Sequence, residues 1–122
     1  MQAHEHAARI WPLLAYAAIH RQTLTYEMLG KLIGIPHFGL GRHLEPIQSY
    51  CLINGLPGLT ALVVKQDGRP GTGFIAAADV PVEQQLVFTY SWLDGPTPTA
   101  DDLLQAVREH PSCGVSEAVT LV

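Results

Sequence analysis

The chain has 122 residues, of which 48% are hydrophobic and 15% are charged, and its net charge is −4. A chain of this size can bury the core of one domain without disulfides or a metal. No apolar run reaches the roughly 20 residues of a membrane-spanning helix, and the first residues show no signal-peptide pattern. The two cysteines lack a CxxC spacing, which is typical of a reducing compartment. We therefore expect one soluble cytoplasmic domain over residues 1–122.

Charge is distributed unevenly along the chain. Residues 1–75 carry six basic and four acidic side chains, whereas residues 76–122 carry one basic and seven acidic side chains. An asymmetry of this kind indicates a nucleic-acid surface on one part of the molecule. The negative charge of the whole chain argues against such a partner and leaves a protein partner open.

The first half of the chain predicts helices with clear boundaries. Residues 7–20 carry apolar side chains at helical spacing, and Pro12 then falls near the first turn, where proline is tolerated. Thr25 predicts an N-cap for a second helix over 26–34. Gly34 is expected to end this helix.

Two further helices are expected before the strands. A short one spans about 37–44, and its two glycines, Gly39 and Gly41, each weaken it by about 1 kcal/mol relative to alanine. Glycines kept at such a cost indicate a close backbone approach, either of a neighbouring helix or of a ligand. Pro46 predicts the first turn of another helix, which Asn54-Gly55 ends.

A β-hairpin is expected next. Residues 59–65 are apolar and β-branched, residues 66–71 are rich in turn formers, and residues 72–76 can form the second strand. Lys65 and Arg69 would stand at the two shoulders of this antiparallel pair. A helix over 81–92, a linker and a last helix capped by Thr99 complete the chain.

The predicted fold is therefore mainly α-helical with a small antiparallel hairpin. The order of the predicted elements is that of a winged helix-turn-helix: two short helices around a tight turn, a third helix and a basic hairpin. We place this core at about 20–76. An acidic helical extension follows over about 80–122. In winged modules the second helix of the pair enters a groove of DNA and the wing contacts the backbone beside it.

A family resemblance supports this order. Residues 25–34 read TYEMLGKLIG and resemble the "(S/T)YGELAxxIG" segment of alkylguanine-DNA alkyltransferases and alkyltransferase-like proteins. Residues 39–44, GLGRHL, resemble the "AVGRAL" recognition helix of that family. Residues 60–64, with Asp67-Gly68 and Gly73-Phe74, resemble its strand, turn and "GGF" wing. The resemblance covers roughly residues 20–76 and implies a winged helix that binds DNA.

The chain departs from this family at the alkyl-acceptor motif. The family's "PCHR" falls where this chain reads Leu59-Thr60-Ala61-Leu62, without cysteine or histidine. Cys51 lies about ten residues too early and is expected to be a small buried side chain. Because the acceptor reaction needs an activated thiolate, we expect no enzyme activity, no catalytic residue, no metal and no cofactor.

The resemblance also assigns binding roles. It places Tyr26 beside a phosphate, puts Gly41 and Arg42 on the recognition helix, and puts Phe38 where the family has an arginine that extrudes a nucleotide. An apolar side chain can also act as a wedge between bases. The candidate nucleic-acid-binding residues are Tyr26, Phe38, Gly41, Arg42, Lys65 and Arg69.

Each candidate also has an ordinary structural explanation. Tyr26 can cover the first helix, Phe38 can pack in the core, and Arg42 can pair with Glu45 or simply be exposed. Lys65 and Arg69 can serve solubility alone. The expected function is a non-enzymatic module that binds duplex DNA; a winged-helix module for a protein partner is the alternative, and an unrecognised enzyme is a third.

Overall fold

The computed structural model describes residues 2–66 and 80–111, and in this part of the chain helices predominate. The prediction of a mainly helical protein is confirmed. None of the described helices is long and apolar enough to cross a membrane. In chain order the elements are α1 (Ala3–Ile19), β1 (Leu24–Thr25), α2 (Tyr26–Ile33), the 3-10 turn η1 (His37–Gly39), α3 (Gly41–Asn54), the 3-10 turn η2 (Leu59–Leu62), β2 (Val63–Val64), α4 (Val80–Thr89) and α5 (Ala100–Glu109).

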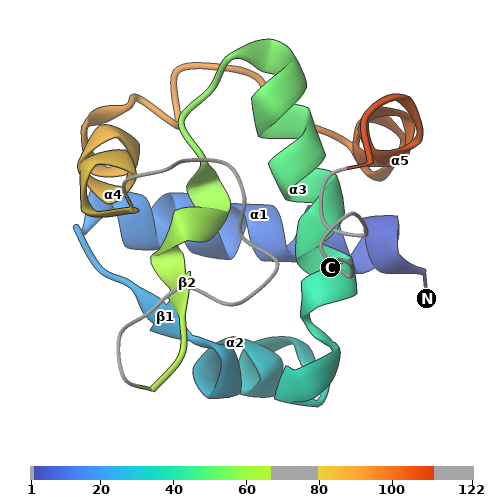
Figure 1. The fold of residues 1–122 in the computed structure, drawn as a ribbon, viewed down its shortest axis with the longest axis horizontal. Helices are drawn as coiled ribbons and strands as arrows, with labels where there is room; N and C mark the ends of the chain where they lie inside the picture. Colours follow the sequence, from blue (N-terminus) through green and yellow to red (C-terminus); the bar gives the residue numbers. More distant parts are fainter. Residues whose placement is uncertain (1, 67–79, 112–122) are drawn as a thin grey trace.

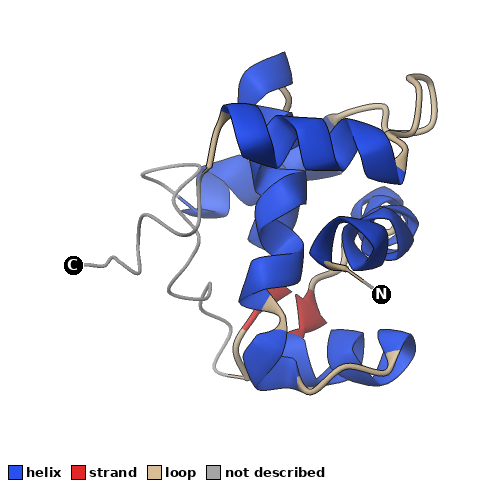
Figure 2. Cartoon of the chain, turned by 90° about the vertical axis from the view of Figure 1, so that its right-hand side faces the viewer, coloured by secondary structure: helices blue, strands red, loops and turns tan. Residues whose placement is uncertain are grey.

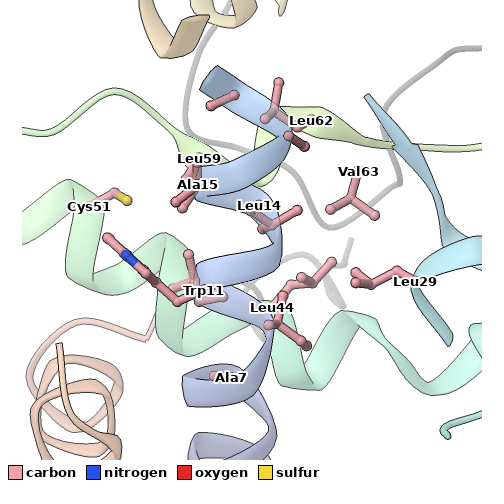
Figure 3. Close-up of a cluster of buried hydrophobic side chains, with 14 of the residues drawn as sticks. Ala7, Trp11, Leu14, Ala15, Leu29, Leu44, Cys51, Leu59, Leu62 and Val63 are labelled. Carbon is pink, nitrogen blue, oxygen red and sulfur yellow. The ribbon is translucent and has the colours of Figure 1, made fainter. Parts of the chain in front are cut away.

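Helix α1 is the centre of the molecule, and α2, α3, α4 and α5 all contact it (Figure 1). Its buried face includes Ile10 and Leu14, which are fully inaccessible to solvent. Full burial of such a side chain contributes about 1.5–3 kcal/mol. The same cluster of buried side chains takes in Leu29 from α2 and Val63 from β2 (Figure 3). Leu103 from α5 also belongs to it. One continuous core therefore joins the first and last described helices.

Helix α1 is longer than its sequence pattern predicted. It begins at Ala3 rather than near residue 7, so Pro12 lies in the middle of the helix and not in its first turn. Proline removes one i→i−4 hydrogen bond there, and the buried face on both sides of it supplies the compensating stability. The extra N-terminal turn brings His6 against α3, a contact that the sequence did not suggest.

The strands pair differently from the prediction. Residues 59–62 form a 3-10 turn, and only Val63–Val64 form a strand. This strand pairs in parallel with β1, with Leu24 opposite Val63 and Thr25 opposite Val64, and the pair is small beside the helices (Figure 2). The expected antiparallel arrangement is wrong for the described strands because α2, η1 and α3 form the crossover that a parallel pair requires. The expected wing strand, 72–76, lies outside the described residues, so the winged helix stays a prediction.

Helix α3 replaces two predicted helices. It runs without a break from Gly41 to Asn54, and Pro46 lies inside it instead of opening a new helix. Pro46 is buried among core side chains. A proline at this position cannot donate a backbone hydrogen bond to the carbonyl of Arg42. Burial of the proline ring offsets the loss of this one bond. Gly55, with φ 66°, ends α3 as the sequence predicted.

Helix α4 is held to the core by side-chain hydrogen bonds as well as by packing, and α5 starts at a capping box. On α4, Glu83 accepts from the backbone N–H of Gly58, and Gln84 donates to the carbonyl of Ala61 over 2.8 Å. On α5, Thr99 and Asp102 form the capping box that starts the helix. The predicted cap at Thr99 is confirmed, whereas α4 ends at Thr89, short of the predicted Trp92.

Two histidine rings meet where α1 crosses α3. The rings of His6 and His43 lie edge to face with their centroids 4.6 Å apart. Burial lowers the pKa of both imidazoles. The positive charges of the N-terminus and Arg9 lower the pKa of His6 further, while His6 and Arg42 do the same for His43. Both rings are therefore neutral in the folded protein near pH 7.

Acidification should destabilise the fold through this pair. Because the folded-state pKa values lie below the unfolded value near 6.5, the unfolded chain binds protons first. The free energy of unfolding should fall as pH drops from 7.5 through 6.5, and the loss should level off below the folded pKa values. Urea denaturation across pH 7.5–5.5 measures this, and His43→Gln should flatten the dependence. A free energy of unfolding that rises on acidification of the parent protein would contradict this prediction.

Candidate nucleic-acid interface

The candidate interface is built on α2, η1 and the start of α3, the segment for which the sequence predicted a helix-turn-helix. Helix α2 starts at the Thr25 cap, whose hydroxyl accepts from the N–H of Met28 over 3.1 Å. It ends at Gly34, which adopts φ 77°. The N–H groups of Gly34 and Ile35 both donate to the carbonyl of Gly30, over 2.8 and 2.9 Å. Both predicted boundaries of α2 are confirmed.

Gly30 makes the tight turn after α2 possible. A Cβ atom at this position would lie 2.5 Å from the carbonyl oxygen of Ile35 and 3.4 Å from the backbone nitrogen of His37. The turn therefore folds back directly over α2. Sequence analysis missed this role and expected a close approach at Gly39 and Gly41, where an added Cβ would meet nothing within 4 Å.

Alanine at position 30 should therefore destabilise the protein. The clash with backbone at Ile35 cannot be relieved by a rotamer change, so we expect Gly30→Ala to lower the free energy of unfolding by about 1–3 kcal/mol. Gly41→Ala is the matched control, because open space surrounds that position; it should be neutral or stabilise by at most about 1 kcal/mol. Chemical denaturation of both variants provides the comparison. Equal stabilities would contradict the account of this turn.

Phe38 stands out on the surface of the turn. It lies in η1 with 86% of its surface exposed, and its nearest ring neighbour is His37, with centroids 5.9 Å apart. The core explanation for Phe38 is therefore wrong. Leu40, two residues later, is fully buried and holds the turn to the core instead. The fold thus places an aromatic side chain in solvent directly before the second helix of the motif.

Arg42 and Gly41 form the first turn of α3, beside Phe38. Arg42 is exposed, and no side chain caps this end of the helix. The backbone of a helix N-terminus carries partial positive charge, which favours an anion. The open space at Gly39 and Gly41 excludes the neighbouring-helix explanation for these two glycines. It leaves the backbone here accessible to a ligand.

The other three predicted binding residues differ in exposure and in whether the structure describes them. Tyr26 is half-buried and packs against the core, as its structural explanation required. Lys65 is exposed just after β2. Arg69 lies outside the described residues, so the predicted clustering of Arg42, Lys65 and Arg69 is only partly visible. Helix α2 contacts both η1 and β2.

Lys31 is a further basic residue that sequence reasoning did not select. It is exposed on α2 and lines a shallow hollow of about 380 Å³ together with Gly34, Pro36 and His37. His37 approaches Glu27 at 4.0 Å across this hollow. A helical-wheel count places Lys31 on the outer side of α2, opposite Leu29 and Ile33, but only the turn geometry shows that this side continues into η1.

Cys51 is a buried thiol in this structure. Its side chain points into the core toward α1 (Figure 3) and is almost fully buried. Burial raises the pKa of the thiol to about 12. The folded protein therefore holds this thiol in its protonated form near neutral pH, and the thiolate is the nucleophile. Its position agrees with the expected role as a small buried side chain.

We therefore expect no alkyl transfer to Cys51. Incubating the protein with a duplex that contains an alkylated guanine should leave the mass of the peptide around Cys51 unchanged. The denatured protein treated with iodoacetamide is the control, because unfolding exposes the same thiol. A mass gain at Cys51 in the folded protein would overturn this prediction and favour an enzyme.

No protein-family model matches the chain, and searches of curated proteins and of solved structures found no match. The resemblance to alkyltransferase-like proteins therefore stays a prediction from short motifs.

Proposed function

We propose that this protein is a non-enzymatic DNA-binding module that docks the start of α3 against duplex DNA. The observation that carries the proposal is the exposure of Phe38 immediately before that helix. Single exposed apolar side chains are common on protein surfaces, so what distinguishes Phe38 is its place in the fold, directly before α3 and close in the chain to the exposed Arg42. In the proposed complex the phenyl ring inserts between bases where stacking is already weak.

The surroundings of Phe38 suit a phosphate backbone. Arg42 supplies a positive charge in the first turn of α3, and the uncapped start of this helix adds partial positive charge. Lys31 is exposed on α2, which contacts η1, and Lys65 is exposed just after β2, which also contacts α2. The open positions at Gly39 and Gly41 allow the sugar-phosphate chain to approach the protein backbone closely.

A protein partner is the second candidate, and one observation favours it. Met28 and Leu32, one turn apart on α2, are 51% and 55% exposed. Together with Phe38 they give the motif more apolar surface than phosphate contacts need. A helix or loop of a partner protein could cover these three side chains.

A comparison of intact and mismatched duplexes separates the two functions. Base insertion requires unstacking, which is least costly at a mismatch. Phe38→Ala should therefore weaken binding to a single-mismatch duplex more than binding to the intact duplex. Leu93→Ala removes an apolar side chain that is 76% exposed outside the motif, and it should change neither affinity. Equal losses on both duplexes for Phe38→Ala would exclude the wedge, and unchanged affinities would favour the protein partner.

A further inference from the structure

Four aromatic residues surround a cavity at the far end of α3. The cavity has a volume of about 230 Å³, and Asn54, the last residue of α3, places it at the opposite end of that helix from η1. Trp11 comes from α1, Tyr50 from α3, and Tyr90 and Trp92 from the segment after α4. The rest of the lining is Asn54, Leu56, Gly95 and Pro96.

The rings stand at steep angles to one another, as the walls of a box do. Trp11 lies edge to face with Tyr50 and with Trp92, at centroid distances of 5.6 and 5.7 Å. Tyr90 is tilted by 58° against Trp92 at 4.5 Å. The indole N–H of Trp92 donates to the carbonyl of Val87 over 2.8 Å. That bond fixes the Trp92 ring and leaves its π system as the side chain's remaining means of binding a ligand.

The polar groups around the cavity favour positive charge. One N–H of the Asn54 amide donates to the carbonyl of Tyr50 over 2.9 Å, which leaves the amide oxygen as an acceptor and the second N–H as a donor. Tyr50 and Asn54 also line an adjoining hollow of about 170 Å³, and the acidic residues Asp102 and Glu109 are among its other lining residues. No lysine or arginine is among the residues that line either space.

We propose that this cavity binds a methylated ammonium group. Aromatic faces attract cations through the ring quadrupole, and the two carboxylates of the adjoining hollow disfavour an anion. An unmodified ammonium has three N–H donors to satisfy, whereas the lining offers few acceptors beside four rings. A quaternary ammonium has no N–H donor, so contact between its methyl groups and the rings leaves no hydrogen bond unsatisfied. This site lies apart from Phe38 and does not depend on the proposed DNA-binding function.

The two tryptophans allow a direct test, because they are the only ones in the chain and both line the cavity. Titration of the intact protein with choline should change the tryptophan fluorescence in a saturable way. The neutral isostere 3,3-dimethylbutan-1-ol should bind at least about fivefold more weakly, because it lacks the cation–π attraction. Equal affinities for the two compounds, or no saturable response to choline, would overturn the proposal.

Matched variants locate the binding. Tyr90→Leu should weaken choline binding roughly 2- to 30-fold, whereas Tyr90→Phe keeps the ring and should keep the affinity within about twofold. Asp102→Asn should weaken binding, and Asp101→Asn removes a charge from the same helical turn outside both cavities and should not. Circular dichroism of each variant checks the fold. Equal effects of the two aspartate substitutions would contradict a local charge contribution.

Two sources can supply a methylated ammonium group, a small molecule such as choline or a methylated lysine in a partner protein. A short peptide with trimethyllysine and the same peptide with unmodified lysine are compared with choline. Tighter binding of the methylated peptide than of choline assigns the site to a protein partner, and the reverse assigns it to a small molecule. An unmodified peptide that binds as tightly as the methylated one would overturn the proposal.

Discussion

Leu40→Ala is expected to lower the free energy of unfolding by about 2–5 kcal/mol. Leu40 is fully buried at the junction of η1 and α3, so its removal leaves a cavity beneath the turn. The natural comparison is Phe38→Ala, two residues earlier, which removes a larger side chain from a position that is 86% exposed. That variant should change stability by no more than about 0.5 kcal/mol.

Urea denaturation of the two variants without any ligand measures this contrast. The difference in the free energy of unfolding between the two variants depends on which of the two side chains faces the core. A loss of 3 kcal/mol or more for Phe38→Ala would mean that the phenyl ring is packed inside the protein, and it would remove the observation on which the proposed function rests.

Arg42→Ala is expected to weaken duplex binding by about 1–3 kcal/mol if the guanidinium reaches a base edge. Arg42 is exposed in the first turn of α3, so the substitution should leave the fold intact. Fluorescence anisotropy with a labelled duplex provides the affinity. The loss should depend on sequence, because base contacts carry the sequence information.

Lys65→Ala is the control for Arg42→Ala. Lys65 is exposed beyond β2 and is expected to contact only the phosphate backbone. Its removal should weaken binding to every sequence alike and reduce the salt dependence by about one unit. An Arg42→Ala variant that binds as the parent protein does would exclude the start of α3 from the interface.

The boundaries of α2 and α5 could be predicted because local chemistry determines them. Thr25, Gly34 and Thr99 each act within one helical turn of their own position, so their roles are visible in the sequence. Pro46 follows the same local rules but lies inside α3. Tertiary packing offset the lost hydrogen bond, and no local pattern reports that packing.

The features that depend on distant contacts were missed. The parallel pairing of Leu24 with Val63 joins residues far apart in the chain, and a two-residue strand has too little pattern to detect. Nothing in the sequence around Gly30 indicates a close contact, because the carbonyl of Ile35 approaches it only through the folded turn. Phe38 and Leu40 are both large apolar side chains, and only the three-dimensional turn decides which one is buried.

The salt dependence of duplex binding by the intact protein tests the central claim most directly. Three or four basic side chains are available at the proposed interface, and each phosphate contact releases a counterion. A plot of the logarithm of the association constant against the logarithm of salt concentration should therefore be linear with a slope of about −3. No measurable binding to duplex DNA at low salt, or an affinity that salt does not change, would contradict the claim and leave a protein as the partner of this surface.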